Sequence, residues 1–377
     1  MKKVLTLMLT IMTIFLLSAC KNNKALKKLA IEHETEFGGI YIKKSIEDFN
    51  NSGFKFGDSV NISFSNGKNV NDVPYYNGYY VDAGEQVLVG YPGYPYIKLT
   101  INYGDDLWNI FELKDTDTAT ITLNKKEKYL DIQESSDITY YDDREKYSSD
   151  SEFSNFREIN VGNIKEGILY RSASPCDNKR KRASITDRLM EQEHIGFILN
   201  LADTDAKIQE YISKDDFNSP YFLKLYTEQK LYISLLESSN VDPIGLNMNY
   251  TSKEFQEKIA SGFRAMLSSD GPFLVHCLEG KDRTGFVCIV LEALLNATYN
   301  EIVDDYMKTY DNYYKIDKND SRYETIKAKN VDSMLKFICS GADYTKVDLS
   351  GYAKTYLLNG GMTESEINLL IDKLSKK

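Results

Sequence analysis

The stretch FLVHCLEGKDRTGFVCIVLEALL, residues 273–295, decides how the second half of this 377-residue chain folds. It begins as a short apolar strand, continues as a polar loop and ends as a helix that is apolar on nearly all sides. A helix of that composition is buried, and a strand without polar alternation is covered on both faces. The stretch therefore predicts the centre of an α/β domain.

Helix and strand patterns alternate on both sides of this centre. GILYRS and IGFILNL, which begin at Gly167 and Ile195, predict strands, whereas residues 183–194, 252–269 and 283–310 predict helices. Thr363 and Glu366 form a capping box at the start of a last helix. The alternation predicts a mostly parallel central sheet flanked by helices.

The first half of the chain has a different pattern. Segments such as GDSVNISFSNG and TATITLNKKEKYLDIQ alternate apolar and polar residues between turn signals. We expect a small antiparallel β-barrel or sandwich over residues 46–135, a polar linker over 136–152 and the α/β domain over 153–377.

The N-terminus has the proportions of a signal peptide. Two lysines precede an apolar run, and Leu17-Ser18-Ala19-Cys20 resembles a bacterial lipobox. We expect residues 1–19 to be removed, Cys20 to be lipidated and residues 20–45 to form a membrane-proximal linker. The protein would then lie on the extracytoplasmic face of the cell membrane. An ordinary signal peptide cut elsewhere, or an uncleaved anchor, fits the same residues.

The net charge and the spacing of cysteines and histidines argue against two classes of protein, nucleic-acid binders and metalloproteins. A formal charge of -10 argues against nucleic-acid binding, which needs a basic face. The remaining four of the five cysteines show no CxxC pair, and the three histidines are far apart in sequence. We therefore predict no metal site and no cofactor, and Cys288 is expected to be a small core residue.

The loop after FLVHC contains residues suited to phosphate chemistry. Cys277 follows the strand, Gly280 permits tight curvature, and Arg283 presents a planar fork for two phosphate oxygens. Backbone N–H groups of such a loop, with the following helix dipole, form a nest for anions and stabilise a thiolate. Thr284 can hydrogen-bond the sulfur. We assign phosphate binding to Leu278, Glu279, Gly280, Lys281, Asp282, Arg283 and Thr284.

HCLEGKDRTG fits the pattern C-x5-R-[ST] and resembles the phosphate loop of the cysteine-based protein tyrosine phosphatase superfamily. The GKDRTG form is most similar to secreted bacterial tyrosine and phosphoinositide phosphatases. FREINVGNIKEGILYRSASP also resembles the strand and Arg-Ser segment of that family. The resemblance covers about residues 153–377. It implies metal-independent hydrolysis through a phosphocysteine on Cys277, with Arg171, Ser172 and His276 in supporting positions.

The general acid remains open among three aspartates. Asp282 lies within the loop, where this subgroup is thought to use an aspartate, and we rank it first. Asp203 follows the strand FILNL and ranks second, and Asp242 is a third choice. Each is also a residue type common in turns and helix caps. Cys176 is a candidate disulfide partner of Cys277.

The substrate also remains open. The resemblance implies a phosphorylated protein of phosphotyrosine type, and Lys281 resembles a lysine that accompanies phosphoinositide substrates in related lipid phosphatases. A phospholipid or an inositol phosphate is therefore the alternative, and a solvated surface lysine is the simpler interpretation. A catalytically silent phosphate-binding surface lipoprotein is a third hypothesis. Residues 55–125 loosely resemble the C-terminal β-domain of the S-adenosylmethionine hydroxide adenosyltransferase family, and we expect an accessory module there.

Overall fold

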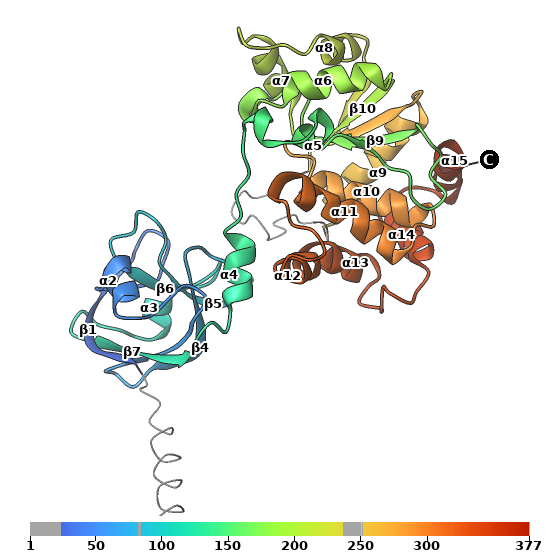
Figure 1. The fold of residues 1–377 in the computed structure, drawn as a ribbon. Coiled ribbons are helices and arrows are strands. Elements are labelled where there is room, and N and C mark those ends of the chain that lie inside the picture. The colour runs from blue at the N-terminus through green and yellow to red at the C-terminus, as the bar shows by residue number, and fades with distance from the viewer. Residues whose placement is uncertain (1–23, 82–83, 237–249, 251, 377) are drawn as a thin grey trace, which may run out of the picture. The chain divides into compact units, whose positions relative to one another are not determined.

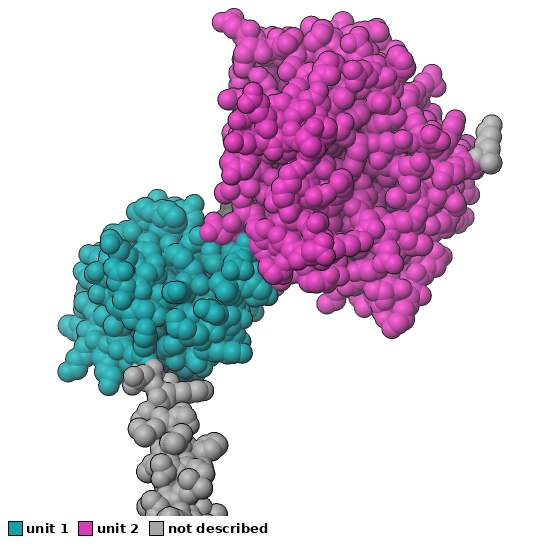
Figure 2. Space-filling view, in the orientation of Figure 1, with its two compact units in different colours: residues 1–136 teal, residues 137–377 magenta. Residues whose placement is uncertain are grey.

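The computed structural model describes residues 24–81, 84–236, 250 and 252–376. The chain forms two compact units, Met1–Ser136 and Asp137–Lys377 (Figure 2). The expected signal peptide, Cys20 and Asp242 lie outside the described residues, so the statements about them stay predictions. Within the described part of the chain, no helix has both the length and the apolar character needed to cross a membrane.

The first unit is a closed seven-stranded barrel (Figure 1). Around the barrel the strands follow in the order β1 (Ala25–His33), β2 (Ile40–Ile42), β6 (Ile97–Ile101), β5 (Gln86–Val89), β4 (Asn69–Tyr76), β3 (Ser59–Phe64) and β7 (Thr118–Lys125). Short helices α2 (Ile46–Asn51), α3 (Leu107–Ile110) and α4 (Leu130–Ser136) accompany them. The predicted barrel is confirmed, although β4 and β5 pair in parallel.

The expected linker over residues 20–45 is wrong, because β1 and β2 lie within it and close the barrel. Strand β1 pairs with β7 through a register shift between Leu26 and Leu29, and Lys28 has a left-handed φ of 57°. A bulge of this kind interrupts the two-residue alternation that identifies a strand. The two adjacent lysines, Lys27 and Lys28, lie at this bulge, so the sequence pattern did not indicate a strand.

The second unit contains a five-stranded sheet in the order β11 (Leu231–Ile233), β10 (Phe197–Asn200), β12 (Phe273–His276), β9 (Leu169–Ser172) and β8 (Arg157–Glu158). All pairs are parallel except β8 with β9. The mostly parallel sheet is therefore confirmed, with β12 at its centre.

Helices cover both faces of this sheet (Figure 1). Helices α6 (Ala183–Gln192), α7 (Asp205–Ile212) and α8 (Pro220–Thr227) pack on the face that carries Ile198 and Leu274. The other face carries Leu199 and Val275 and packs against the helices that follow. These are α9 (Lys253–Leu267), α10 (Asp282–Leu294), α11 (Tyr299–Tyr314), α12 (Tyr323–Lys327), η3 (Ala328–Asp332), α13 (Ser333–Ile338), α14 (Leu349–Asn359) and α15 (Glu364–Leu374). Adjacent residues of one strand thus face opposite layers.

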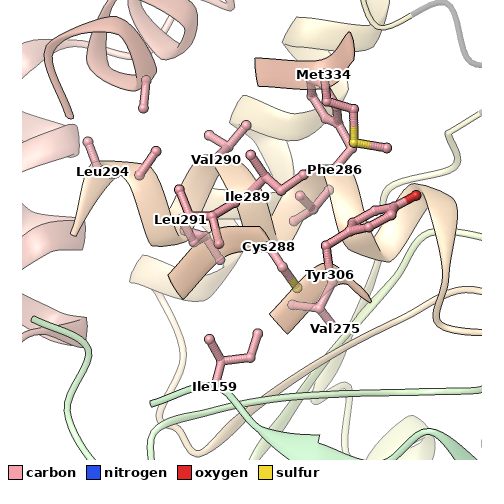
Figure 3. Packing of buried hydrophobic residues seen from close by; sticks show 14 of the residues in the cluster. Ile159, Val275, Phe286, Cys288, Ile289, Val290, Leu291, Leu294, Tyr306 and Met334 are labelled. Atoms are coloured by element: carbon pink, nitrogen blue, oxygen red, sulfur yellow. The ribbon is translucent and has the colours of Figure 1, made fainter. Parts of the chain in front are cut away.

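Helix α10 is the buried helix expected after the loop. Its residues from Thr284 to Leu294 are all buried, Cys288 among them. Figure 3 shows its side chains packed with Val275 of β12, Tyr306 of α11 and Met334 of α13. The helix expected over 283–310 is in fact two, because Asn296 adopts a left-handed φ of 61° and Thr298 caps α11.

Candidate active site

Three parallel strands end together at one edge of the sheet. Asn200 of β10, His276 of β12 and Ser172 of β9 are register partners at their carboxyl ends. The loops that carry Asp203, Cys277 and Cys176 leave from these positions. Anion sites form at this edge of parallel sheets. Cys277 lies at the centre of the edge and is only 3% exposed.

Gly280 gives the loop its tight curve. Its φ is +66°, in the left-handed region that glycine adopts without strain. A Cβ at this position would lie 2.2 Å from the carbonyl oxygen of Ser172. Two independent constraints, conformation and space, therefore require glycine where the loop passes the end of β9.

The carbonyl oxygens of the loop are bound from outside. The Leu278 oxygen accepts from the Ser174 N–H at 3.0 Å, and the Glu279 oxygen accepts from the Tyr313 hydroxyl at 2.8 Å. The Gly280 oxygen accepts from Arg171 Nη2 at 2.9 Å and from Asn155 Nδ2 at 3.2 Å. Loop carbonyls that point outward leave the loop N–H groups to point inward. With the free N–H groups of the first turn of α10, they suit an oxyanion.

Behind the loop, two arginines share one aspartate. Arg171 Nη1 donates to one Asp305 carboxylate oxygen, and Arg157 Nε donates to the other at 2.8 Å. Burial opposes the charge on Asp305, but the two arginines outweigh it and hold the pKa of that carboxyl well below its usual range. Arg171 is completely buried. It therefore supports the loop from behind.

Arg157 also orients Asn155. Arg157 Nη1 donates to Asn155 Oδ1, and Asn312 Nδ2 donates to the same oxygen at 3.0 Å. The Asn155 amide nitrogen is thereby directed at the loop carbonyls. Sequence reasoning missed Asn155, Asp305 and Tyr313. Asp305 lies 134 residues from Arg171 and Asn155 lies 125 residues from Gly280. Tyr313 is only 34 residues from Glu279 but belongs to no motif.

His276 and Ser172 are buried at the strand ends. His276 Nδ1 donates to the Cys277 carbonyl at 3.2 Å. Burial lowers the pKa of His276 to about 4, so the ring is neutral at pH 7. A neutral ring that donates to a main-chain oxygen can orient this segment. The Ser172 hydroxyl donates to the Ala173 carbonyl at 2.8 Å.

Arg283 and Thr284 begin helix α10. Arg283 is partly buried, and its Nη1 donates to the Leu201 carbonyl at 3.3 Å, beyond the end of β10. Thr284 is buried, and its hydroxyl has no hydrogen-bond partner among the residues that the structure describes. Both side chains thus have donors available for a bound anion or a neighbouring sulfur.

Asp282 and Lys281 differ from each other in exposure. The Asp282 side chain is 36% exposed and lies 3.6 Å from Lys281 Nζ. Burial raises the pKa of the Asp282 carboxyl, against the opposing effect of Lys281. The interpretation of Lys281 as a solvated surface lysine is wrong, because its side chain is only 5% exposed. Its Nζ lies 5.5 Å from the ring centroid of Tyr310 and 6.0 Å from that of Tyr314.

Asp203 is more enclosed than Asp282. It is 6% exposed, and Asn200 Nδ2 and the Tyr211 hydroxyl each donate to it at 3.2 Å. Burial raises the pKa of this carboxyl as well. The Cys176 Sγ lies 3.9 Å from Asp203 Oδ2.

Cys176 is a free, buried thiol, as are Cys277, Cys288 and Cys339. Burial, followed by the nearby charge of Asp203, raises the pKa of the Cys176 thiol well above its ordinary value. The disulfide suggested for Cys176 and Cys277 is not formed. Cys176 instead lines a pocket of about 520 Å³ that also includes Leu278 of the loop and three lysines, Lys179, Lys207 and Lys214.

The linker expected over residues 136–152 is wrong, because residues 137–152 belong to the second unit and form part of its packed structure. This segment contains η1 (Arg144–Lys146) and α5 (Asp150–Ser154), and its charged side chains form ion pairs with Arg180, Arg182 and Arg188. We call residues 137–148 the strap. Its Tyr140 hydroxyl donates to the Glu279 carboxylate in the phosphate loop. Polar composition alone had suggested a solvated connection.

The model of the tyrosine phosphatase family matches residues 151–376. The match does not include the barrel, whose resemblance to the adenosyltransferase β-domain stays a prediction.

Three solved structures are also similar to the chain. The core catalytic domain of the PP-IP phosphatase SIW14 from S. cerevisiae is 22% identical, with 51% of this chain and 94% of that chain covered and a TM-score of 0.28. TpbA from P. aeruginosa in complex with pTyr is 14% identical, with 50% of this chain and 96% of that chain covered and a TM-score of 0.25. The PTP-2 phosphatase from Cydia pomonella is 14% identical, with 46% and 91% covered and a TM-score of 0.25.

Proposed function

Because the chain belongs to the tyrosine phosphatase family and is a cysteine-dependent hydrolase of that type, we propose that it hydrolyses phosphate monoesters of phosphotyrosine type with Cys277 as its nucleophile. One observation carries the proposal. The carbonyl oxygens of residues 278–280 are all bound from outside, so the loop beside Cys277 presents its N–H groups to an anion.

In the first step the Cys277 thiolate attacks phosphorus. An S–P bond forms as the P–O bond to the leaving group breaks, and the leaving oxygen takes a proton from a carboxylic acid. Arg283 and the N–H nest bind the equatorial oxygens, where charge gathers in the transition state. In the second step water attacks phosphorus, the S–P bond breaks, and the carboxylate accepts the proton from water.

We propose Asp282 as the acid. Its carboxyl is the more exposed of the two candidates, and its raised pKa favours the protonated form that an acid needs. Asp203 also has a raised pKa, but two donors fix its oxygens in a buried position. Asp203 remains the alternative.

A phosphoinositide or inositol phosphate is the second candidate substrate, and the pocket beside Leu278 favours it. Lys207 and Lys214 both pair with Glu210, at 2.7 and 3.2 Å, and Lys179 has no ion pair within the described ranges. Three lysines within one pocket offer charge for a further phosphate, although Asp177 and Asp216 also line it. Hydrolysis rates on phosphotyrosine peptides and on phosphoinositides, compared for Lys179→Ala, separate the two substrates.

We further propose that Cys20 is lipidated and anchors the protein outside the cytoplasm. The support is the lipobox-like sequence at Leu17–Cys20. Incorporation of labelled palmitate that is lost in Cys20→Ser tests the proposal, and equal labelling of both proteins would contradict it.

The test of the chemistry uses residues 21–377 with p-nitrophenyl phosphate in the presence of a chelator. Cys277→Ser is expected to lower kcat on the order of 10⁴-fold or more, because a hydroxyl is a far weaker nucleophile. Cys339→Ser, which alters another buried free thiol, is the matched control. Activity that persists in Cys277→Ser would refute the mechanism.

The acid is identified by the leaving group. Phenyl phosphate releases a more basic oxygen than p-nitrophenyl phosphate and depends more strongly on protonation. Loss of the true acid is expected to lower kcat on phenyl phosphate about 10²-fold or more, with a smaller effect on the nitrophenyl ester. The two variants Asp282→Asn and Asp203→Asn are compared. The acid is the aspartate whose replacement lowers kcat on phenyl phosphate more than kcat on the nitrophenyl ester.

A further inference from the structure

The phosphate loop contains a negative charge of its own. Glu279 lies between Leu278 and Gly280, and its side chain is 22% exposed. Burial is the main cause that raises the pKa of Asp282, and the charge of Glu279 adds to it. The Glu279 carboxylate is therefore close enough to act on groups of the loop. A carboxylate free to approach the nest would repel a phosphate dianion.

The strap holds this carboxylate at one side. The Tyr140 hydroxyl donates to Glu279 Oε1, and Arg180 Nη2 lies 3.9 Å from the same oxygen. A donor and a cation at one carboxylate oxygen fix its direction and reduce its effective charge toward other groups. Tyr140 is the closer of the two partners.

Tyr140 is itself fixed by its ring. It stacks on Tyr313 with centroids 5.1 Å apart and planes 21° apart. The guanidinium groups of Arg180 and Arg182 each lie 5.0 Å from its centroid. Tyr313 donates to the main-chain oxygen of Glu279 at 2.8 Å. The two stacked tyrosines thus bind the main chain and the side chain of one loop residue.

We propose that Tyr140 is a positioning residue that turns the Glu279 carboxylate away from the phosphate nest and so sets the affinity of the loop for phosphate dianions. The inference rests on the proposed phosphatase function, since it concerns the same loop. It assigns to the strap a part in substrate binding, and it accounts for a glutamate in a loop that binds anions. Removal of the hydroxyl leaves the Glu279 carboxylate with the more distant Arg180 and allows it to turn toward the nest.

The test is a double-mutant cycle on residues 21–377. Tyr140→Phe keeps the stacked ring and removes only the hydroxyl. We expect the KM for p-nitrophenyl phosphate and the inhibition constant of inorganic phosphate to rise roughly three- to tenfold, with a smaller change in kcat. In the Glu279→Gln background the same substitution is expected to change neither constant by more than about twofold.

Tyr147→Phe is the matched control. The Tyr147 hydroxyl lies in the same strap and donates to the Tyr141 carbonyl at 2.8 Å, so its loss perturbs the strap and leaves Tyr140 in place. Phosphate affinity should stay within about twofold of wild type. The inference would be overturned if Tyr140→Phe weakened phosphate binding equally in the wild-type and Glu279→Gln backgrounds. It would also be overturned if Tyr140→Phe weakened binding in neither background. Calorimetry with inorganic phosphate measures the same affinities without turnover, so a failure of the proposed hydrolysis is seen separately.

Discussion

Each unit of the protein buries an ion pair, and the two differ in their balance of charge. In the barrel, Lys98 Nζ lies 2.8 Å from Glu34 Oε2, and both side chains are buried. One cation meets one anion. In the catalytic unit, Arg157 and Arg171 meet a single aspartate, Asp305.

The difference lies in where the remaining donors point. The Lys98 ammonium lies under the rings of Phe37, Tyr79 and Tyr94 and binds within the barrel. Arg171 has donors left after it binds Asp305, and they hold the carbonyls of Gly280 and Lys281. A balanced buried pair thus serves the fold, whereas the unbalanced group also orients the phosphate loop and adds positive charge behind it.

The largest expected effect comes from Asp305→Asn. It leaves the buried guanidinium of Arg171 and the partly buried guanidinium of Arg157 without their shared carboxylate. The catalytic unit is therefore expected to lose about 3–5 kcal/mol of stability and most of its activity. Urea unfolding followed by helical circular dichroism reports this unit. The only tryptophan, Trp108, lies in the barrel core, so its fluorescence reports the barrel and should keep its midpoint. A shared shift of both signals would contradict the separation of the two units.

Lys98→Met makes the converse change in the barrel. Glu34 then stays buried without its cation but still accepts from the N–H groups of Glu36 and Phe37. We expect the barrel to lose about 2 kcal/mol, seen in Trp108 fluorescence, with unchanged kcat and KM. A fall in phosphatase activity in a protein that is still folded would show that the balanced pair also serves the site.

At pH 5 the smallest effect is expected from Glu292→Gln, which tests how many negative charges lie behind the loop. Burial, with the charge of Asp305 beside it, raises the pKa of Glu292 well above its ordinary value and so favours the protonated form. As pH rises above about 4.5 the unfolded chain loses a proton that the folded chain keeps, and wild type loses stability. The variant does not lose stability in this way. Its free energy of unfolding should therefore rise relative to that of wild type by up to about 1.4 kcal/mol per pH unit.

Urea midpoints measured between pH 5 and 8 give this slope for both proteins. A constant difference across the range would mean that Glu292 is ionised in the folded state. Two acids would then balance the two arginines, and the contrast with the barrel would disappear.

The centre of the catalytic unit was predictable from the sequence because its determinants are local. The strand, Gly280 and the apolar helix follow one another within residues 273–294, and the structure places them accordingly. The last helix was equally predictable, since Thr363 and Glu366 form the capping box. Local sequence signals of this kind need no knowledge of the rest of the chain.

The support of the site was not predictable, because its determinants are distant. Asp305 lies 134 residues from Arg171, and Tyr140 lies 139 residues from Glu279. The charged residues of the strap resemble a linker until their partners, Arg180 and Arg182, are placed beside them. Strand β1 was missed for a different reason, since its bulge at Lys28 breaks the alternation.

The strap has a consequence for the choice of a minimal catalytic fragment. The family match begins at residue 151 and invites a truncation there. Such a fragment would retain every residue of the anion nest and still lack Tyr140, which contacts Glu279 from eleven residues upstream of that boundary. The Michaelis constant of this fragment would describe a loop whose Glu279 carboxylate lacks the closer of its two partners. The functional boundary of this phosphatase therefore begins where the barrel ends.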